Sequence, residues 1–168
     1  VNVSAPQFQQ KNFVEKVAHA LTAAALPPEM LELELTESIL IGDADSTFLL
    51  LRELADLGIR LAIDDFGTGY SSLAYLKRFP IQRLKIDKSF VDKLPDDESD
   101  VAITNAVINL GHALKLKVIA EGVESESQRD FLLAAGCDEF QGWLFSKALA
   151  PEDFERLVQQ MAAGSAAP

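Results

Sequence analysis

Hydrophobic and polar residues alternate along five short segments of the chain, and this alternation predicts β-strands. Successive side chains of a strand point to opposite faces, so each segment has one apolar face and one polar face. A sixth strand is expected near Asp138. The five segments cover residues 1–3, 31–37, 61–65, 83–87 and 117–121.

Helical patterns fill the stretches between these strands. Gly58 is a suitable C-terminal cap, the run from Ser125 to Gln128 fits a capping box, and Pro151 suits a first helical turn. We expect the tail, residues 162–168, to be disordered. The predicted helices cover 9–25, 44–57, 71–78, 99–116 and 125–136, with a last one beginning at residue 151.

Strands that alternate with helices predict a parallel sheet of the α/β class. The repeat of roughly thirty residues is that of a TIM-like (β/α)8 barrel, and about six βα units are present. A doubly wound open sheet is the alternative, but it does not explain polar positions on the inner face of so many strands. Since the chain begins inside a strand pattern, we expect an N-terminally incomplete domain over residues 1–161 that lacks two units.

The composition excludes several classes of protein. A net charge of −11 argues against DNA or RNA binding, which needs a basic face. The single cysteine, Cys137, excludes an internal disulfide and a cysteine-rich zinc site and favours the cytoplasm. Anchoring of a longer parent protein to the inner membrane stays open. An anionic ligand would need cations to offset the negative charge of the chain.

The polar faces of the strands carry the candidate chemistry. In a barrel these side chains converge at the carboxyl ends of the strands, where active sites lie. Carboxylates, an amide and an ammonium brought together indicate a metal-dependent site, because charged groups are rarely buried without partners. The converging residues are Asn2, Glu34, Asp64, Lys85 and Glu121.

The segment from Asp64 to Leu73 is the sharpest local pattern. Adjacent acids Asp64 and Asp65 at a strand end can hold two cations, and the glycines that follow permit a tight, mobile loop. Glu37, just beyond its strand, either braces a neighbouring loop or is a simple turn acid. Lys85 and Asp87 form either a structural ion pair or part of the site.

The segment from Gln141 to Phe145 is less informative. Gln141 can hydrogen-bond a ligand and Trp143 can stack on one, but a purely structural role in the core is about as well supported for Trp143 and Phe145.

Six motifs, by their sequences and their order along the chain, resemble those of the EAL domain family. This family consists of the bacterial phosphodiesterases that cleave cyclic di-GMP to linear pGpG. The resemblance extends to about Met161. The motifs are Asn2-Val3-Ser4-Ala5, Glu34-Leu35-Thr36-Glu37, Asp64-Asp65-Phe66-Gly67-Thr68-Gly69, Lys85-Ile86-Asp87, Glu121-Gly122-Val123-Glu124 and Gln141-Gly142.

The resemblance implies a TIM-like fold, cyclic di-GMP as substrate and two divalent cations, Mg²⁺ or Mn²⁺. It implies that Lys85 positions the attacking water, that Glu121 or a neighbouring acid takes its proton, and that Glu37 holds the loop of residues 66–73. Glu124 and Gln141 would line the substrate site. The implied metal ligands are Asn2, Glu34, Asp64, Asp65 and Glu121.

The chain departs from the family in one serious respect, because the Glu-Ala-Leu motif itself would lie upstream of Val1. The alternative is therefore an inactive EAL-like module that binds cyclic di-GMP or a protein partner. Upstream sensor or GGDEF domains are the partners expected in the parent protein, and homodimerisation stays open.

Overall fold

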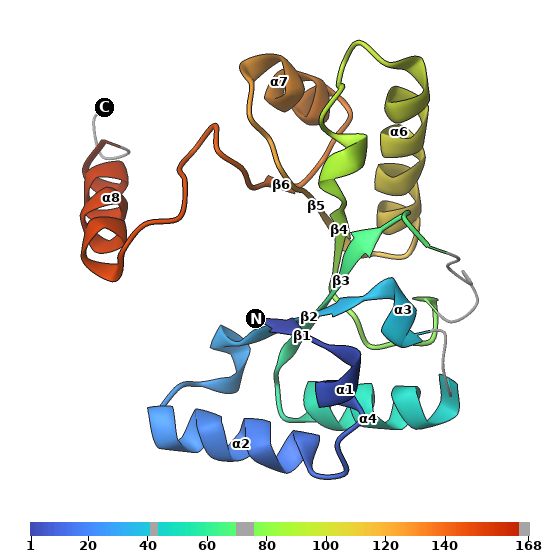
Figure 1. Cartoon of the computed structure of the whole chain (residues 1–168), viewed down its shortest axis with the longest axis vertical. Helices are drawn as coiled ribbons and strands as arrows, with labels where there is room; N and C mark the ends of the chain where they lie inside the picture. Colours follow the sequence, from blue (N-terminus) through green and yellow to red (C-terminus); the bar gives the residue numbers. More distant parts are fainter. Residues whose placement is uncertain (41–43, 70–75, 165–168) are drawn as a thin grey trace.

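The structure is a computed structural model that describes residues 1–40, 44–69 and 76–164 (Figure 1). Within these residues six strands form one parallel sheet in which every strand pairs with the next in sequence. They are β1 (Asn2–Val3), β2 (Glu32–Thr36), β3 (Arg60–Phe66), β4 (Arg83–Ile86), β5 (Lys117–Ala120) and β6 (Glu139–Phe140).

Helices connect the strands and lie outside the sheet, as Figure 1 shows for α4, α6 and α7. The sequential strand order confirms a barrel-like arrangement, because a doubly wound sheet reverses its strand order part-way. The helices are α1 (Ala5–Phe8), α2 (Phe13–Ala24), α3 (Glu37–Leu40), α4 (Ala44–Asp56), α6 (Glu98–Ala113), α7 (Glu126–Ala134) and α8 (Pro151–Gly164), with short 3-10 turns η1 (Pro28–Met30) and η2 (Lys88–Phe90).

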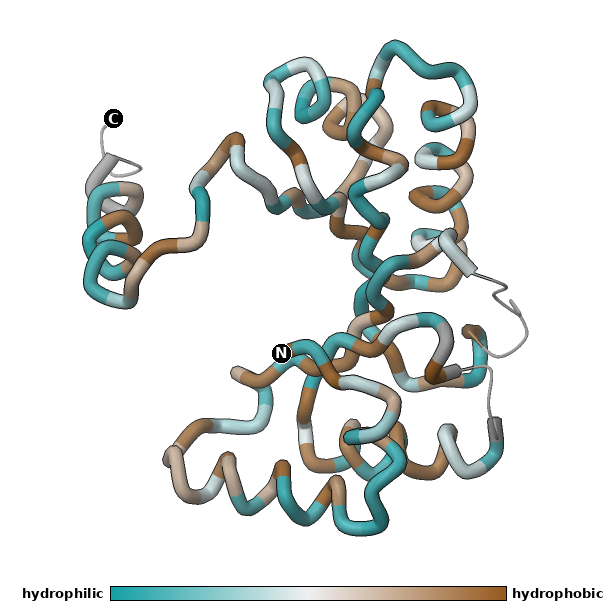
Figure 2. Tube along the Cα trace, viewed as in Figure 1, coloured by the Kyte–Doolittle hydropathy of each residue, from teal (hydrophilic) through white to brown (hydrophobic). Residues whose placement is uncertain are grey.

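The core lies between the outer face of the sheet and the helices. The apolar strand positions expected from the alternation are all buried. Figure 2 shows hydrophobic (brown) and hydrophilic (teal) segments in turn along the chain. Removing these side chains from water is the main stabilisation of the sheet. The buried positions are Leu33, Leu35, Leu61, Ile63, Leu84, Ile86, Val118 and Ala120.

The first predicted helix, over residues 9–25, is wrong at its start. The chain forms the short α1 and then α2, because Ser4 and Gln7 make a capping box that begins a helix at Ala5. α2 follows from Asn12 as its N-cap. Two other helix predictions shift by a few residues, with Asp97 rather than Ser99 setting the start of α6.

Two predictions fall partly beyond what the structure describes. The helix expected over 71–78 covers residues 70–75, which lie outside the described residues. α8 continues to Gly164, three residues into the tail that we expected to be disordered. Figure 1 shows α8 apart from the other helices. None of the described helices is long and apolar enough to cross a membrane.

Candidate active site

Lys85 is the centre of the site. It lies on β4 with only 3% of its side chain exposed, and its ammonium forms ion pairs with carboxylates from three other segments. Lys85 Nζ lies 2.9 Å from Glu34 Oε1, 3.0 Å from Asp64 Oδ1 and 2.5 Å from Glu121 Oε1. The convergence expected at the carboxyl ends of the strands is therefore present.

The electrostatics of this cluster follow from burial and charge. Burial alone would lower the pKa of Lys85, but hydrogen bonds to Glu121, Glu34 and Asp64 outweigh it and raise that pKa above its ordinary value. Burial raises the pKa of Glu121, and the charges of Asp64 and Glu34 add to it, while Lys85 partly opposes the rise. Lys85 is therefore a protonated donor, and Glu121 holds a proton more readily than an ordinary glutamate.

Two amides complete the ring of polar groups. Gln141 Nε2 donates to Glu121 Oε1 at 2.7 Å. In one orientation of its amide, Asn2 Nδ2 donates to Glu34 Oε2 at 3.2 Å and to Asp64 Oδ2 at 3.0 Å. In the other orientation the Asn2 oxygen faces those two carboxylate oxygens, and only a cation between them would make that arrangement favourable.

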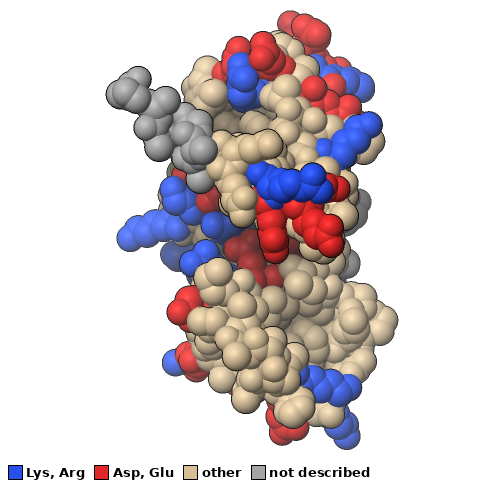
Figure 3. All heavy atoms as spheres, turned by 90° about the vertical axis from the view of Figure 1, so that its left-hand side faces the viewer, with Lys and Arg blue, Asp and Glu red and all other residues tan. Residues whose placement is uncertain are grey.

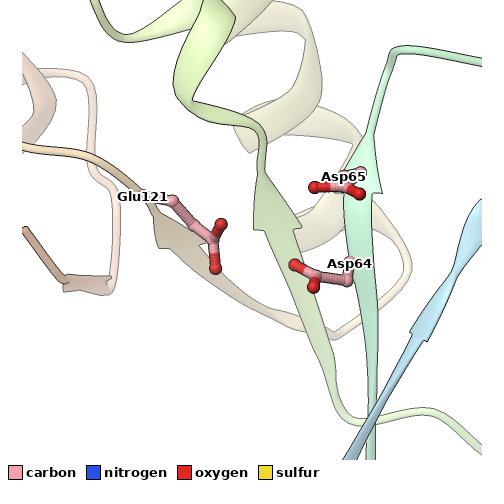
Figure 4. Close-up of side chains that lie close together, drawn as sticks. All are labelled: Asp64, Asp65 and Glu121. Carbon is pink, nitrogen blue, oxygen red and sulfur yellow. The ribbon is translucent and has the colours of Figure 1, made fainter. Parts of the chain in front are cut away.

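Among the described residues, Asp64, Asp65 and Glu121 form a group of acids that could hold a metal ion (Figure 4). One ligand oxygen from each lies within 4.8 Å of the others. Asp64 Oδ1 is buried and forms an ion pair with Lys85 Nζ. Carboxylate oxygens are ligands that Mg²⁺ and Mn²⁺ prefer, and three of them lie this close together, so these residues fit divalent cations.

Asp65 differs from Asp64 in its backbone. Its φ of 54° lies in the left-handed region, which turns its carboxylate relative to that of Asp64. Burial raises the pKa of Asp65, and the neighbouring charges of Asp64 and Asp87 raise it further. A cation would relieve this repulsion, so the two acids are poised to bind one.

Glu37 begins α3 and is 4% exposed. Its Oε2 accepts a hydrogen bond from the backbone N–H of Gly67 at 3.4 Å, and its carboxylate would contact a Cβ built on Gly69. Among the described residues its other oxygen, Oε1, has no hydrogen-bond partner. Glu37 thus contacts the start of the expected loop, while residues 70–73 of that loop lie outside the described residues.

A pocket of about 320 Å³ adjoins the acids and includes Glu124, Gln141 and Trp143 in its wall. Lys88 pairs with Glu124, and its ammonium lies 5.3 Å from the centre of the Trp143 ring. Trp143 is 61% exposed and Phe145 is 49% exposed, so the core interpretation of these two aromatic residues is wrong. Figure 3 shows acidic side chains in the hollow between the two halves of the molecule.

Asp87 does not pair with Lys85, which corrects the ion-pair interpretation. Its carboxylate accepts from the backbone N–H of Ser89 and caps η2, because β4 ends one residue earlier. The sequence analysis did not single out Lys88, nor Arg83, which forms ion pairs beneath the site. Arg83 stands two residues before Lys85, so the same alternation could have placed it on the inner face.

The EAL domain family matches residues 1–148 of the chain. The chain belongs to the EAL domain family. It is 48% identical over 158 residues to the signaling protein YkoW of Bacillus subtilis, covering 94% of this chain and 20% of that protein. The chain thus spans about a fifth of the length of the curated relatives it matches.

Solved EAL structures share the fold. The PaMucR phosphodiesterase in its c-di-GMP complex has a TM-score of 0.89 and 46% identity, covering 92% of this chain and 62% of that chain. The manganese/cy-diGMP complex of Klebsiella pneumoniae BlrP1 has a TM-score of 0.80 and 34% identity, covering 88% of this chain and 38% of that chain. The TIM-like α/β fold expected from the sequence is therefore confirmed.

Proposed function

We propose that this chain is the C-terminal part of an EAL domain that hydrolyses cyclic di-GMP to linear pGpG. The observation that carries the proposal is the convergence of Glu34, Asp64 and Glu121 on Lys85 at the carboxyl ends of four strands or their extensions. The similarity to PaMucR, a phosphodiesterase solved with c-di-GMP, supports the same substrate.

Two divalent cations, Mg²⁺ or Mn²⁺, would be held by oxygen atoms of this site. When bound, they would supply the positive charge that activates water and stabilises the leaving oxygen of a phosphodiester. The BlrP1 complex contains manganese, which supports this choice. The proposed metal ligands are Asn2, Glu34, Asp64, Asp65 and Glu121.

The remaining residues have separate roles in the proposal. Lys85 stays protonated because of its raised pKa, so it donates a hydrogen bond that orients the attacking water. Glu121 or a neighbouring acid accepts the proton of that water. Glu37 holds the Gly67 end of the loop. Glu124 and Gln141 line the pocket beside the acids and contact the nucleotide.

The alternative is an inactive EAL-like module that binds cyclic di-GMP or a protein. All the candidate residues above are present in this chain, which favours an enzyme. Cytoplasmic sensor or GGDEF domains in the same protein would be its regulatory partners, and a homodimer is a further proposal.

The proposal is tested in the protein that carries this chain together with the rest of its EAL domain. Asp64→Asn and Asp65→Asn should each lower the rate of pGpG formation at saturating Mg²⁺ by at least a hundredfold. Asp96→Asn is the matched control, because Asp96 is an exposed acid that is not among the candidate site residues. Either site variant keeping near-normal turnover would refute its assignment, and binding without turnover in the unmodified protein would favour the alternative.

A further inference from the structure

A second ionic set lies inside the sheet, below the acidic cluster. Arg83 Nε lies 3.2 Å from Glu32 Oε2, and Arg83 Nη1 lies 3.1 Å from Glu139 Oε2. About a quarter or less of the Arg83 and Glu32 side chains is exposed, while Glu139 is less buried. Glu32 lies on β2, Arg83 on β4 and Glu139 on β6. The Arg83 guanidinium therefore connects β2 and β6, neither of which is paired with β4.

Each member of this set stands two residues before a member of the site. Glu32 precedes Glu34, Arg83 precedes Lys85, and Glu139 precedes Gln141. Side chains two residues apart on a strand point to the same face, and the inner side chains of such barrels form layers contributed by alternate strands. Glu32, Arg83 and Glu139 therefore form the layer of side chains directly beneath the site.

The strand pairing of β6 is short. β6 pairs with β5 at only two positions, and both of its residues are only partly buried. Immediately after it, the backbone N–H of Gln141 donates to Ala120, and the Gln141 carbonyl accepts from Val123. The hydrogen bond from the Gln141 side chain to Glu121 depends on this placement.

We propose that Arg83, acting with Glu32 and Glu139, is a positioning residue for the metal site. By connecting β2 to β6 across the inside of the sheet, it sets the curvature that brings Glu34 and Gln141 to the same cluster. Its removal would let the two sides of the site separate without removing any ligand. The inference rests on the proposed function insofar as it takes Glu34 and Glu121 to be metal ligands.

The test uses the complete EAL domain of the protein and Mn²⁺ alone as the probe. Arg83→Met and Glu139→Gln should each weaken Mn²⁺ binding about tenfold, the range typical when a residue that orients metal ligands is lost. The double variant should be little worse than either single one, since both remove the same contact. Arg83→Lys, which keeps the charge, should recover part of the affinity.

Arg52→Met and Asp56→Asn are the matched controls, because that ion pair is on the outer surface of α4 with both side chains more than half exposed. They should leave the Mn²⁺ affinity within twofold. Hydrogen exchange supplies a readout that needs no metal. In Arg83→Met the amides of Gln141 and Val123 should exchange at least tenfold faster, while those of β2 and β3 change little.

The outcomes separate the two proposals. Unchanged Mn²⁺ affinity and unchanged exchange at Gln141 and Val123 in the folded variants would overturn the positioning role, even if stability fell. Mn²⁺ binding that responds as expected, in a protein that does not hydrolyse cyclic di-GMP, would refute the proposed function and leave the positioning role intact. If the unmodified domain bound no Mn²⁺, the exchange rates alone would decide.

Discussion

Replacing Lys85 with methionine is the most direct perturbation of the site. Methionine has a similar length and keeps the volume of the side chain but removes its charge. Glu34, Asp64 and Glu121 would then face one another with no cation between them. We expect Lys85→Met to destabilise the metal-free domain strongly and to abolish hydrolysis.

The magnitude follows from the burial of the ammonium and the three short distances. Each pair at about 3 Å is worth roughly 5–6 kcal/mol of attraction at an effective dielectric constant of about 20, before the cost of burial is subtracted. Breaking a buried ion pair by removing one partner costs about 3–5 kcal/mol, because the other charge stays buried. We expect a loss of that size in the free energy of unfolding.

Divalent cations should reverse much of this loss, because they can replace the ammonium as the positive charge of the cluster. Binding at one hundred times the dissociation constant stabilises a folded protein by about 2.7 kcal/mol. The assay is urea unfolding with and without Mn²⁺ for the unmodified domain, Lys85→Met and the control Lys117→Met. Lys117 also pairs with an acid but is 63% exposed, so its loss should matter much less.

Two results would refute the reasoning. A Lys85→Met domain that is as stable as the unmodified one without metal would show that the carboxylates do not need the ammonium. A destabilised variant that gains no more from Mn²⁺ than the unmodified domain would show that cations do not bind where the ammonium lies.

Two further predictions concern single acids. Burial alone would raise the pKa of Asp138, but hydrogen bonds from Lys117, Val118 N–H and His112 lower it to about 2. The ionised Asp138 carboxylate therefore contributes fully to stability above its ordinary pKa of about 3.8, and this contribution is lost as the pH falls toward 2. After allowance for solvent screening, Asp138→Asn should lower the free energy of unfolding by about 1 kcal/mol at pH 7 and by almost nothing at pH 2. Urea unfolding at both pH values measures the difference. Glu37→Gln should lower turnover about tenfold and speed hydrogen exchange at Gly67, while Mn²⁺ affinity stays within twofold; unchanged exchange at Gly67 would contradict the brace.

The sequence predicts the sheet and the acidic cluster well because both depend on local alternation. Once Leu33 and Leu35 face the helices, Glu34 must face inward, and the same reasoning places Asp64 and Lys85. The parallel order of the strands then brings these side chains to one end. No contact between distant segments has to be known for this step.

Contacts that depend on curvature could not be predicted in the same way. Arg83 meets Glu32 and Glu139 only because the sheet bends enough for β2 and β6 to lie within reach of β4. The exposure of Trp143 likewise depends on how the segment after β6 runs over Val123, where a Cβ at Gly142 would clash with the Val123 backbone. The first helix starts earlier than predicted because Ser4 and Gln7 form a capping box. This is a local signal that periodicity alone does not contain.

The behaviour of the 168-residue chain by itself is the last prediction. An apolar groove of about 330 Å³ runs beside edge strand β1 and includes Val3, Phe13 and Leu33 in its wall. On α8, Phe154, Val158 and Met161 are spaced as one face of a helix and are 47–63% exposed. Exposed apolar surface and free strand edges of this kind promote association.

We therefore expect the chain expressed alone to self-associate and to bind the dye ANS, with little hydrolysis of cyclic di-GMP. A version extended to the full EAL domain should be less associated and active, because the solved EAL chains extend well beyond the part that this chain covers. Size-exclusion chromatography, dye fluorescence and pGpG formation measure the three properties. A monomeric 168-residue protein that unfolds cooperatively, binds no dye and hydrolyses cyclic di-GMP at the full rate would show that the groove and the α8 face need no cover.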